Sequence, residues 1–400
     1  MIFFQNPDRQ WFKKTISQWV RNKNAMNKYE YLLDHYLQQG VVNVILPVAK
    51  VGKVSKGVNI FLRLVRFRIW LLINKLSYKN FNVLFSYDTI KSKDTVFSFF
   101  HDNFASTPVC CDNELYIDMI YKAECSFLVH LNHYVYNVEK GSQICSKVHR
   151  LSFVAETNLY RHSIYFSERF DWYRRDVLIL PFCVQDRFIV KSKVSRTLKA
   201  VATGSVTFRL NEATFLEYFG TDLLQPQRKY LLDNSEAVSN LDMSTSEYGS
   251  FKNKGLFLSL FLKFKQNIAS FIPSYCLDTA KLTNFYDIDL SEHYNSYNFV
   301  ICPSELIGLP GVGAFEAMAC GAVLIDDSNK FYDDYGLYSD EHYICYDGTI
   351  GDLKSTLDWL VENPEYVDDL RVKSLDVVNK TMRKESCIST FESHIINVTG

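Results

Sequence analysis

The sequence predicts an α/β fold with two domains, and three observations carry this prediction. The chain has 400 residues, which is more than one ordinary hydrophobic core accommodates. Hydrophobic residues make up 47% and aromatic residues 15%, so there is enough apolar material for two cores and no compositional sign of disorder. Short apolar runs alternate with helical stretches, which is typical of parallel sheets connected by crossover helices.

The predicted strands are short apolar runs spread over the whole chain. They lie at 42–47, 82–86, 151–155, 177–181, 199–202, 298–302, 322–326 and 343–346. Residues 350–382 have a helical periodicity that Pro364 interrupts, which predicts two consecutive helices. Residues 234–253 are rich in Ser, Glu and Asn and predict a surface loop or lid.

A charged segment at 171–176 leads into one of these strands and indicates a domain boundary. We therefore expect an N-terminal Rossmann-like domain over 1–175 and a C-terminal Rossmann-like domain over 176–380. Residues 381–400 are expected to form a C-terminal helix or tail.

Charge and cysteine content exclude several classes of function. The 44 Lys and Arg nearly cancel the 45 Asp and Glu, so nucleic acid is not an expected partner. The ten cysteines show no spacing typical of metal ligands and no DxD-type motif stands out, so we expect neither a metal nor another cofactor. Residues 1–7 lack the pattern of a secretory signal, which predicts a cytoplasmic protein.

One segment, residues 57–76, has unusual chemistry because Arg and Lys interleave with Phe, Trp, Leu and Ile. A helix of this composition can lie in the interface of an anionic bilayer, which would make the protein peripheral on the inner membrane. It can equally be a core helix whose arginines extend to the surface. The sequence leaves both interpretations open.

The strongest motif spans residues 298–326. An apolar strand is followed by a Gly-rich loop, a helix that begins near Gly313 and ends at Gly321, and a second strand. Glycines let backbone N–H groups approach a phosphate, and a helix N-terminus adds partial positive charge. Glu316, expected on the first helical turn, could accept hydrogen bonds from both ribose hydroxyls. The segment therefore predicts a nucleotide-binding unit.

The order Pro-Ser at 303–304, Gly-Leu-Pro at 308–310 and Glu-Ala-Met-Ala-Cys-Gly at 316–321 resembles the donor site of GT-B glycosyltransferases. The close match covers residues 303–327, and the two-domain layout extends it loosely over the chain. This resemblance implies two Rossmann-like domains with a cleft between them and a ribose-binding role for Glu316. The donor-binding residues implied by the motif are Ser304, Gly311, Gly313, Ala314, Phe315 and Glu316.

The chain departs from the GT-B pattern at two places. The family has a second glutamate eight positions before the ribose-binding one, and that position is Gly308 here, with Glu305 further upstream. Residues 203–209 also lack the Arg and Lys pair that neutralises a nucleoside diphosphate in the family. A CMP-sugar carries one phosphate and needs less cationic compensation, which a helix N-terminus can largely provide. These departures favour CMP-Kdo as the donor.

With that donor, the chain resembles the bacterial retaining β-Kdo transferases of lipopolysaccharide O-antigen and capsule assembly, including residues 180–188 and 202–205. Further donor contacts are expected from residues around the second domain's first strand. These are Arg187, Lys199, Gly204 and Ser205. Arg187 and Lys199 are candidates for the donor's carboxylate or phosphate.

The resemblance also implies a catalytic aspartate in the cleft that forms a covalent glycosyl adduct. We expect this to be Asp233, kept ionised by Arg228 and Lys229, although a solvated loop position is the alternative. Glu156 follows a predicted strand at its C-terminal end and is the candidate general base, with an ion-paired structural role as the alternative. Three histidines are further candidate bases. They are His130, His133 and His162.

The function expected from these residues is transfer of Kdo from CMP-Kdo to a sugar acceptor on a lipid-linked or growing bacterial surface glycan. Its partners are then a nucleotide sugar and a glycan, and further transferase domains could follow the chain. One alternative is a retaining hexosyltransferase that uses a UDP- or GDP-sugar. Another is a non-catalytic scaffold in a glycan assembly complex.

Overall fold

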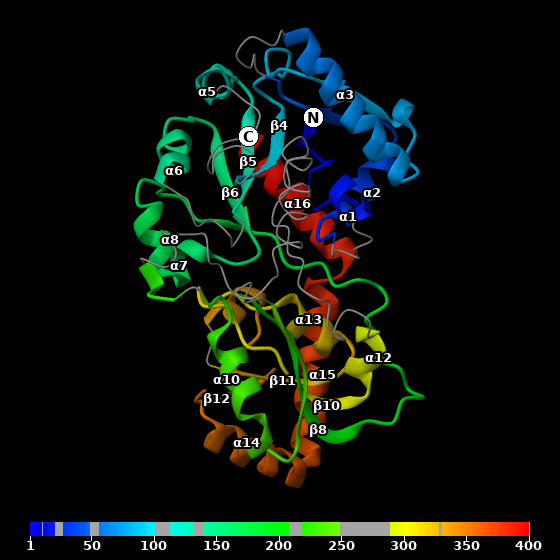
Figure 1. The fold of residues 1–400 in the computed structure, drawn as a ribbon, viewed down its shortest axis with the longest axis vertical. Helices are drawn as coiled ribbons and strands as arrows, with labels where there is room; N and C mark the ends of the chain where they lie inside the picture. Colours follow the sequence, from blue (N-terminus) through cyan, green and yellow to red (C-terminus); the bar gives the residue numbers. More distant parts are fainter. Residues whose placement is uncertain are drawn as a thin grey trace, which may run out of the picture.

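The structure, a computed structural model, describes most of the chain. The described residues are 1–9, 11–20, 27–48, 56–100, 113–131, 139–207, 218–221, 223–248, 289–327 and 330–399. Within them the chain forms two parallel sheets, which confirms the predicted α/β fold with two domains (Figure 1). The first sheet has seven strands in the order β3-β2-β1-β4-β5-β6-β7, and the second has five in the order β12-β11-β10-β8-β9.

The N-terminal sheet is built of short, apolar strands. They are β1 (Ile2–Gln5), β2 (Val42–Ile45), β3 (Phe81–Leu84), β4 (Thr95–Phe99), β5 (Ser126–His130), β6 (Leu151–Ala155) and β7 (Leu178–Ile179). Every residue of β4, β5 and β6 is buried, as expected for parallel strands covered by helices on both faces. The C-terminal ends of these strands share one edge of the sheet, where sites of α/β proteins concentrate.

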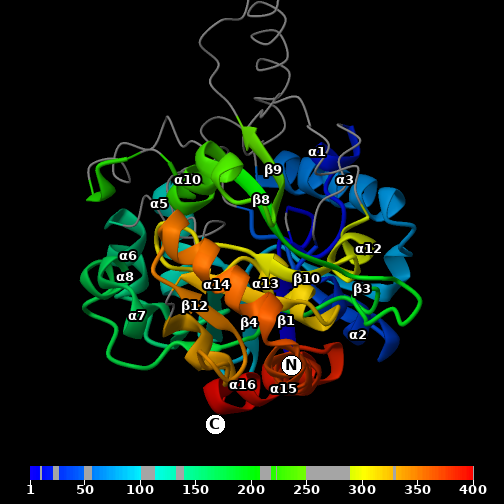
Figure 2. The same ribbon diagram turned by 90° about the horizontal axis from the view of Figure 1, so that it is seen from below.

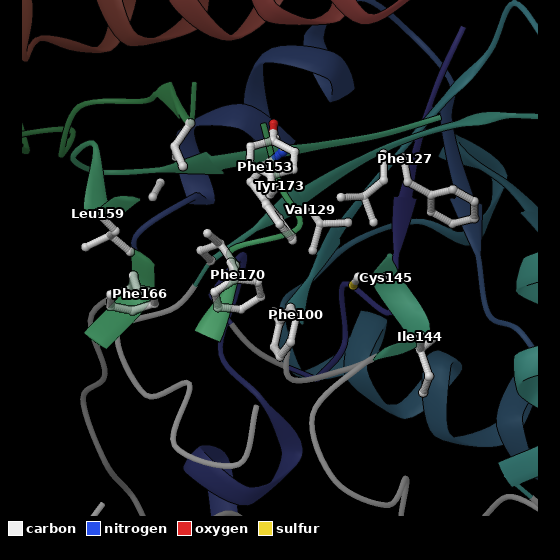
Figure 3. Close-up of a cluster of buried hydrophobic side chains, with 14 of the residues drawn as sticks. Phe100, Phe127, Val129, Ile144, Cys145, Phe153, Leu159, Phe166, Phe170 and Tyr173 are labelled. Atoms are coloured by element: carbon white, nitrogen blue, oxygen red, sulfur yellow. Dashed lines mark hydrogen bonds between the residues drawn. The ribbon is translucent and has the colours of Figure 1, made fainter. Parts of the chain in front are cut away.

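Helices cover both faces of this sheet. They are α1 (Ile16–Val20), α2 (Glu30–Gln38), α3 (Lys56–Ile73), α5 (Asn113–Tyr121), α6 (Glu139–Cys145), α7 (Leu159–His162), α8 (Ile164–Arg169) and the short 3₁₀ helix η1 (Tyr78–Asn80). On one face Phe127, Val129 and Phe153 pack against α6, α7 and α8 (Figure 3). On the other face, Phe4 and Phe97 pack against α2, α3 and the C-terminal helix α16 (Lys384–Thr399).

The C-terminal sheet contains the predicted nucleotide-binding unit. Its strands are β8 (Thr197–Thr207), β9 (Leu241–Tyr248), β10 (Tyr297–Ile301), β11 (Val323–Asp327) and β12 (Ile344–Tyr346). Its helices are α10 (Pro226–Asn234), α12 (Leu290–Asn295), α13 (Val312–Ala319), α14 (Ile350–Glu362) and α15 (Pro364–Thr381), with the 3₁₀ helices η2 (Ser235–Ala237) and η4 (Lys330–Tyr335). Helices α13 and α15 pack on one face, and α10 and α14 pack on the other.

The chain passes between the two sheets twice. Strand β7 pairs with β6 and lies past residue 175, the last residue of the expected N-terminal domain, so the chain leaves the first sheet only after Ile179. The predicted C-terminal helix is α16, which returns to the N-terminal domain and buries Cys387 and Phe391 in its core (Figures 1 and 2). The described part of the domain boundary therefore lies between β7 and β8.

Two local predictions have clear outcomes. The helices expected over 350–382 are α14 and α15, with Pro364 as the first residue of α15, so that prediction is confirmed. The surface loop expected over 234–253 is wrong for residues 241–248, which form β9 and pair with β8. Residues 249–253 lie outside the described residues.

A buried ion pair holds α3 to the loop that follows β1. Arg63 donates two hydrogen bonds of 2.6 Å to the two carboxylate oxygens of Asp8, and Arg66 lies 3.1 Å from one of them. Burial alone would raise the pKa of Asp8, but the charges of Arg63 and Arg66 hold it well below its usual range. The helix is therefore fixed in orientation by charge as well as by packing.

We predict that Asp8→Asn destabilises the N-terminal domain by about 3–5 kcal/mol, because it leaves buried guanidinium charge uncompensated. The difference from wild type is fully present above pH 3.8, the usual pKa of Asp8, and shrinks as the pH falls below that value. Urea unfolding measures this. Asp118→Asn, which breaks an exposed pair with Lys122, is the control and should cost under about 1 kcal/mol. Equal effects of the two substitutions would contradict the prediction.

Candidate functional site

The candidate site begins where the strand order of the C-terminal sheet reverses. Strand β8 lies between β9 and β10. The next strand in the chain, β9, is added on one side of β8, and the strand after it, β10, is added on the other side. Such a switch point opens a crevice at the C-terminal ends of the strands, which is where open α/β sheets bind ligands. Gly204 and Ser205 lie near the end of β8, and Cys302 and Ser304 follow β10. The predicted strand at 199–202 is thus longer than expected and includes Gly204 and Ser205.

Helix α13 begins at this crevice. Gly311 is its N-cap residue and has no side chain to accept a hydrogen bond from the first turn. Four backbone N–H groups at the start of a helix have no partner within the helix, so this end is suited to an anion. Ala314 and Phe315 are fully buried, and Phe315 packs on Tyr335 with ring centroids 4.9 Å apart. Their side chains therefore belong to the core.

A buried arginine from another helix reaches the same point. Arg228 of α10 donates hydrogen bonds to the backbone oxygens of Ser205 (3.0 Å) and Pro303 (2.9 Å). Its Nε is buried without a hydrogen-bond partner among the described residues. A Cβ on Gly204, whose φ is +111°, would lie 2.8 Å from the Arg228 Cζ, and one on Gly311 would lie 3.2 Å from its Nη2. Glycine is required at position 204 by its φ and by the guanidinium, whereas a side chain at position 311 would need Cys302 or Arg228 to shift slightly.

Glu316 is a buried carboxyl on α13, and its charge and that of Arg228 both act on the Cys302 thiol. Helix α13 begins at Val312, so Glu316 lies on the second turn and not on the first as expected. The residue is 4% exposed, and its carboxyl makes no hydrogen bond or ion pair with the described part of the chain. Burial raises the pKa of Glu316 from 4.5 to about 8, and the charge of Arg187 opposes this only in part. A buried carboxyl without a partner is costly and is typical of a functional site.

The structure also explains why the family's second glutamate has no counterpart. Gly308 has a φ of +86°, and a Cβ there would lie 2.6 Å from the Cε2 atom of Phe331. A side chain at this position would be strained and would collide with the Phe331 ring. Glu305 is half-buried and accepts a hydrogen bond of 3.4 Å from Gln225. The 305–309 turn therefore presents no carboxylate at position 308.

A second cluster lies on the N-terminal domain, around Glu156. Glu156 follows β6 and is 4% exposed, as expected for a residue at the C-terminal end of a strand. Tyr29 donates a hydrogen bond of 3.2 Å to Oε1 of Glu156, and Nζ of Lys28 lies 3.4 Å from the same atom. Nε2 of His130 lies 3.3 Å from Oε2. The cluster gathers a carboxylate, an imidazole, a phenol and an ammonium group from three separate segments.

A pocket of about 10 Å³, room for about one water molecule, lies where the two domains meet. Its lining comes from both domains and from the segment between β7 and β8. The lining residues are Lys28, Tyr29, Pro181, Phe182, Cys183 and Val312. Val312 is the first residue of α13, and Lys28 and Tyr29 contact Glu156, so the pocket lies between the two clusters. Tyr335 of η4 donates a hydrogen bond to the backbone oxygen of Glu156, which ties the two domains together here.

A further contact between the domains involves one of the candidate histidines. His162 lies 3.1 Å from a carboxylate oxygen of Asp334, and the other oxygen accepts a 2.6 Å hydrogen bond from the backbone of Asn158. His162 therefore contributes to the domain interface. His130 belongs to the Glu156 cluster, whereas His133 lies outside the described residues.

The remaining predicted residues are not brought into these clusters. Asp233 is exposed at the end of α10 and pairs with Lys229 one turn earlier, while Arg228 is buried and contacts Ser205 and Pro303. The expected proximity of Asp233 to the charge of Arg228 is therefore not seen. The helix places them on different faces, because five residues correspond to about 1.4 turns.

The two cations expected near the donor have different surroundings. Lys199 lies at the start of β8, away from the switch point, and forms an ion pair of 2.9 Å with Asp242. Arg187 is exposed and stacks on Phe188, with its Cζ 4.6 Å from the ring centroid. Its charge reaches Glu316 nonetheless, since it lowers the pKa of that carboxyl. The sequence motif does not single out Arg228 as a donor contact, because nothing local links it to residues 303–313.

Comparison with known proteins identifies the fold. No protein-family model matches the chain, and no curated protein matches its sequence. Sucrose-phosphate synthase from Thermosynechococcus elongatus matches with a TM-score of 0.54 at 10% identity, covering 99% of this chain and 98% of that one. Anabaena HepE in complex with UDP matches with a TM-score of 0.53 at 9% identity and 99% coverage of both chains. HepE with UDP and glucose matches with a TM-score of 0.51 at 9% identity, again over 99% of both chains. With its two parallel sheets and these full-length matches, the chain has the GT-B fold.

Proposed function

We propose that the protein is a glycosyltransferase that binds a nucleotide sugar at the switch point of its C-terminal sheet. The observation that carries this proposal is that three groups lie around Cys302 in the described part of the chain. They are the N-terminus of α13 with its N-cap Gly311, Arg228 with a buried Nε that has no hydrogen-bond partner there, and the buried carboxyl of Glu316. A phosphate suits the first two groups, and a ribose suits the third. A nucleotide accounts for Arg228, Gly311 and Glu316 together.

For the donor, we propose CMP-Kdo or a related CMP-ulosonate. The phosphodiester of such a donor carries one negative charge, which one guanidinium and one helix N-terminus can balance. The carboxylate of the sugar would need a further cation, and the pocket between the domains, at about 10 Å³, would have to widen to admit it. Lys28 lines that pocket and lies 5.0 Å from the ring centroids of both Trp11 and Phe182, which fixes the position of its ammonium group.

A UDP- or GDP-hexose is the second candidate donor. The argument against this donor is that the sequence after β8 lacks the cations that neutralise a diphosphate. In the structure, Arg228 of α10 provides one such cation at the end of β8. The structures of HepE with UDP, and with UDP and glucose, have the same fold as this chain. The two negative charges of the diphosphate would then face one buried guanidinium. A second cationic side chain would be needed, and the exposed Arg187 is a candidate.

For the transfer step, we propose that Glu156 acts on the acceptor hydroxyl as a general base. Tyr29 and Lys28 hold one oxygen of Glu156, and His130 approaches the other, so the carboxylate is fixed in orientation beside the pocket. A retaining reaction would also need a carboxylate nucleophile. Asp233 stays the proposal for that role. It is exposed and paired with Lys229, so its carboxylate would have to leave this pair and approach the donor to act as the nucleophile.

The test is nucleotide release from a panel of donors, namely CMP-Kdo, UDP-glucose and GDP-mannose, incubated with the full chain and detected by chromatography. We expect release from one donor class, CMP-Kdo first, and loss of release in Glu156→Gln. Release from UDP-glucose or GDP-mannose instead would select the hexosyltransferase. If the chain binds nucleotide but releases none from any donor, with or without glycan acceptors, the scaffold interpretation replaces the enzyme.

A further inference from the structure

Helix α3 presents an exposed apolar face that the proposed function does not use. Its exposed apolar side chains are Val58, Phe61, Leu62, Val65, Ile69 and Leu72, which we call the α3 stripe. Their spacing of three and four residues places them along one side of the helix. Phe61 is 64% exposed and Leu72 is 78% exposed. Figure 1 shows α3 along the outside of the N-terminal domain.

The opposite face of α3 is fixed in the core. Phe67 and Trp70 are fully buried and stack with ring centroids 5.5 Å apart, and Arg63 forms its bidentate pair with Asp8. The interpretation of residues 57–76 as a core helix therefore explains the apolar residues of the buried face, but not those of the α3 stripe. Because the buried face is fully used, the helix cannot rotate to hide the α3 stripe.

The stretch of sequence that contains the α3 stripe has only basic charges, two of which, Arg63 and Arg66, pair with Asp8. The sequence contains no Asp or Glu from His35 to Tyr87, although the whole chain has a net charge of −1. The basic residues of this stretch are Lys50, Lys53, Lys56, Arg63, Arg66, Arg68, Lys75 and Lys79. Lys56, Arg68 and Lys75 lie on α3 or next to it and are exposed. Positive charge beside an exposed apolar face complements an anionic bilayer surface, where lipid headgroups lie above acyl chains.

We propose that α3 docks the protein on an anionic membrane surface, with the α3 stripe in the boundary between headgroups and acyl chains. No helix in the described part of the chain is long and apolar enough to span a bilayer, so α3 would lie in the plane of the membrane. On the buried face of α3, the contact of Arg63 with Asp8 joins the helix to the loop after β1, at the same sheet edge as Glu156. A lipid-linked acceptor would thus be held near the Glu156 cluster, but docking itself does not depend on the enzymatic function.

The test is sedimentation of the full chain with sucrose-loaded vesicles of phosphatidylcholine, with and without phosphatidylglycerol. Phe61→Glu combined with Leu72→Glu disrupts the α3 stripe. The matched control combines Ile164→Glu with Val372→Glu, which replaces two aliphatic residues that are 73% and 67% exposed on other helices. Both double variants add the same charge. Circular dichroism and urea unfolding check that each of them folds.

Wild type and control are expected to sediment with the anionic vesicles, less so at high salt, and the α3 variant should bind about tenfold more weakly or not at all. The proposal is overturned if wild type stays in the supernatant, or if the α3 variant binds as strongly as the control. Light scattering adds a third outcome. A wild-type dimer that the α3 variant abolishes, without vesicle binding, would identify a second copy of the chain as the occupant and also overturn the proposal.

Discussion

Glu316→Gln is expected to be more stable than the wild-type protein at pH 8 while binding nucleotide more weakly. Burial raises the pKa of the Glu316 carboxyl from 4.5 in the unfolded chain to about 8 in the folded protein. Below pH 4.5 the carboxyl is protonated in both states, so it has no effect on the pH dependence of unfolding. As the pH rises from 4.5 to 8, the Glu316 carboxyl ionises in the unfolded chain but stays largely protonated in the folded protein. This lowers the free energy of unfolding of the wild-type protein by up to about 5 kcal/mol.

A neutral amide at position 316 would remove this loss, so the difference between variant and wild type should grow with pH through that window. Urea unfolding at several pH values between about 4 and 9 measures it, with the exposed Glu362→Gln as the control. Thermal shift by added nucleotide measures the functional cost. If the variant is the less stable protein at pH 8, the Glu316 carboxylate has a stabilising partner and the prediction fails.

Glu156→Gln is expected to lower kcat by roughly a hundredfold or more while leaving nucleotide affinity nearly unchanged. The amide keeps the shape of the side chain and can still contact Tyr29 and His130, but it cannot take a proton from an acceptor hydroxyl. The loss should therefore appear in the chemical step, because the substitution does not touch the proposed nucleotide site around Arg228 and Glu316. Steady-state kinetics with the donor identified by nucleotide release provides the measurement.

Tyr335→Phe is the control for the Glu156 substitution. It removes the hydrogen bond from η4 to the backbone oxygen of Glu156 but leaves the carboxylate in place, so only a small effect on kcat is expected. Near wild-type turnover in Glu156→Gln would exclude the general-base role. An equal loss in both variants would indicate that Glu156 matters for the domain interface and not for proton transfer.

Much of the fold can be predicted because short apolar runs bounded by polar residues identify buried parallel strands. Strands β4 and β5 are nevertheless absent from the predicted strands, although every residue in them is buried, since polar members such as Ser98 and His130 interrupt or end the apolar pattern. Strand β9 is predicted as a loop for a related reason. It lies at the sheet edge, and only Leu241, Met243 and Tyr248 are apolar among residues 241–248, so its composition resembles that of a surface segment.

The candidate site can be predicted only where its residues are contiguous in the sequence. Gly311, Gly313 and Glu316 belong to one strand–loop–helix unit, so local spacing identifies them. Arg228 comes from a helix that precedes this unit by most of a domain, and only the three-dimensional packing of α10 against β8 brings it to Gly204. For Asp233, closeness in the sequence is misleading. The residue is five positions from Arg228 but lies on an exposed face of the helix, away from the buried guanidinium.

The most direct test of the proposed nucleotide site is a calorimetric titration of the full chain with CMP, UDP and GDP, repeated on Glu316→Ala. We predict that one nucleotide binds with a single site per chain and a Kd on the order of micromolar, and that Glu316→Ala weakens it at least about tenfold. CMP as the tightest ligand would support the CMP-ulosonate donor. Binding of none of the three to the folded wild-type protein, or binding unaffected by Glu316→Ala, would contradict the proposed site.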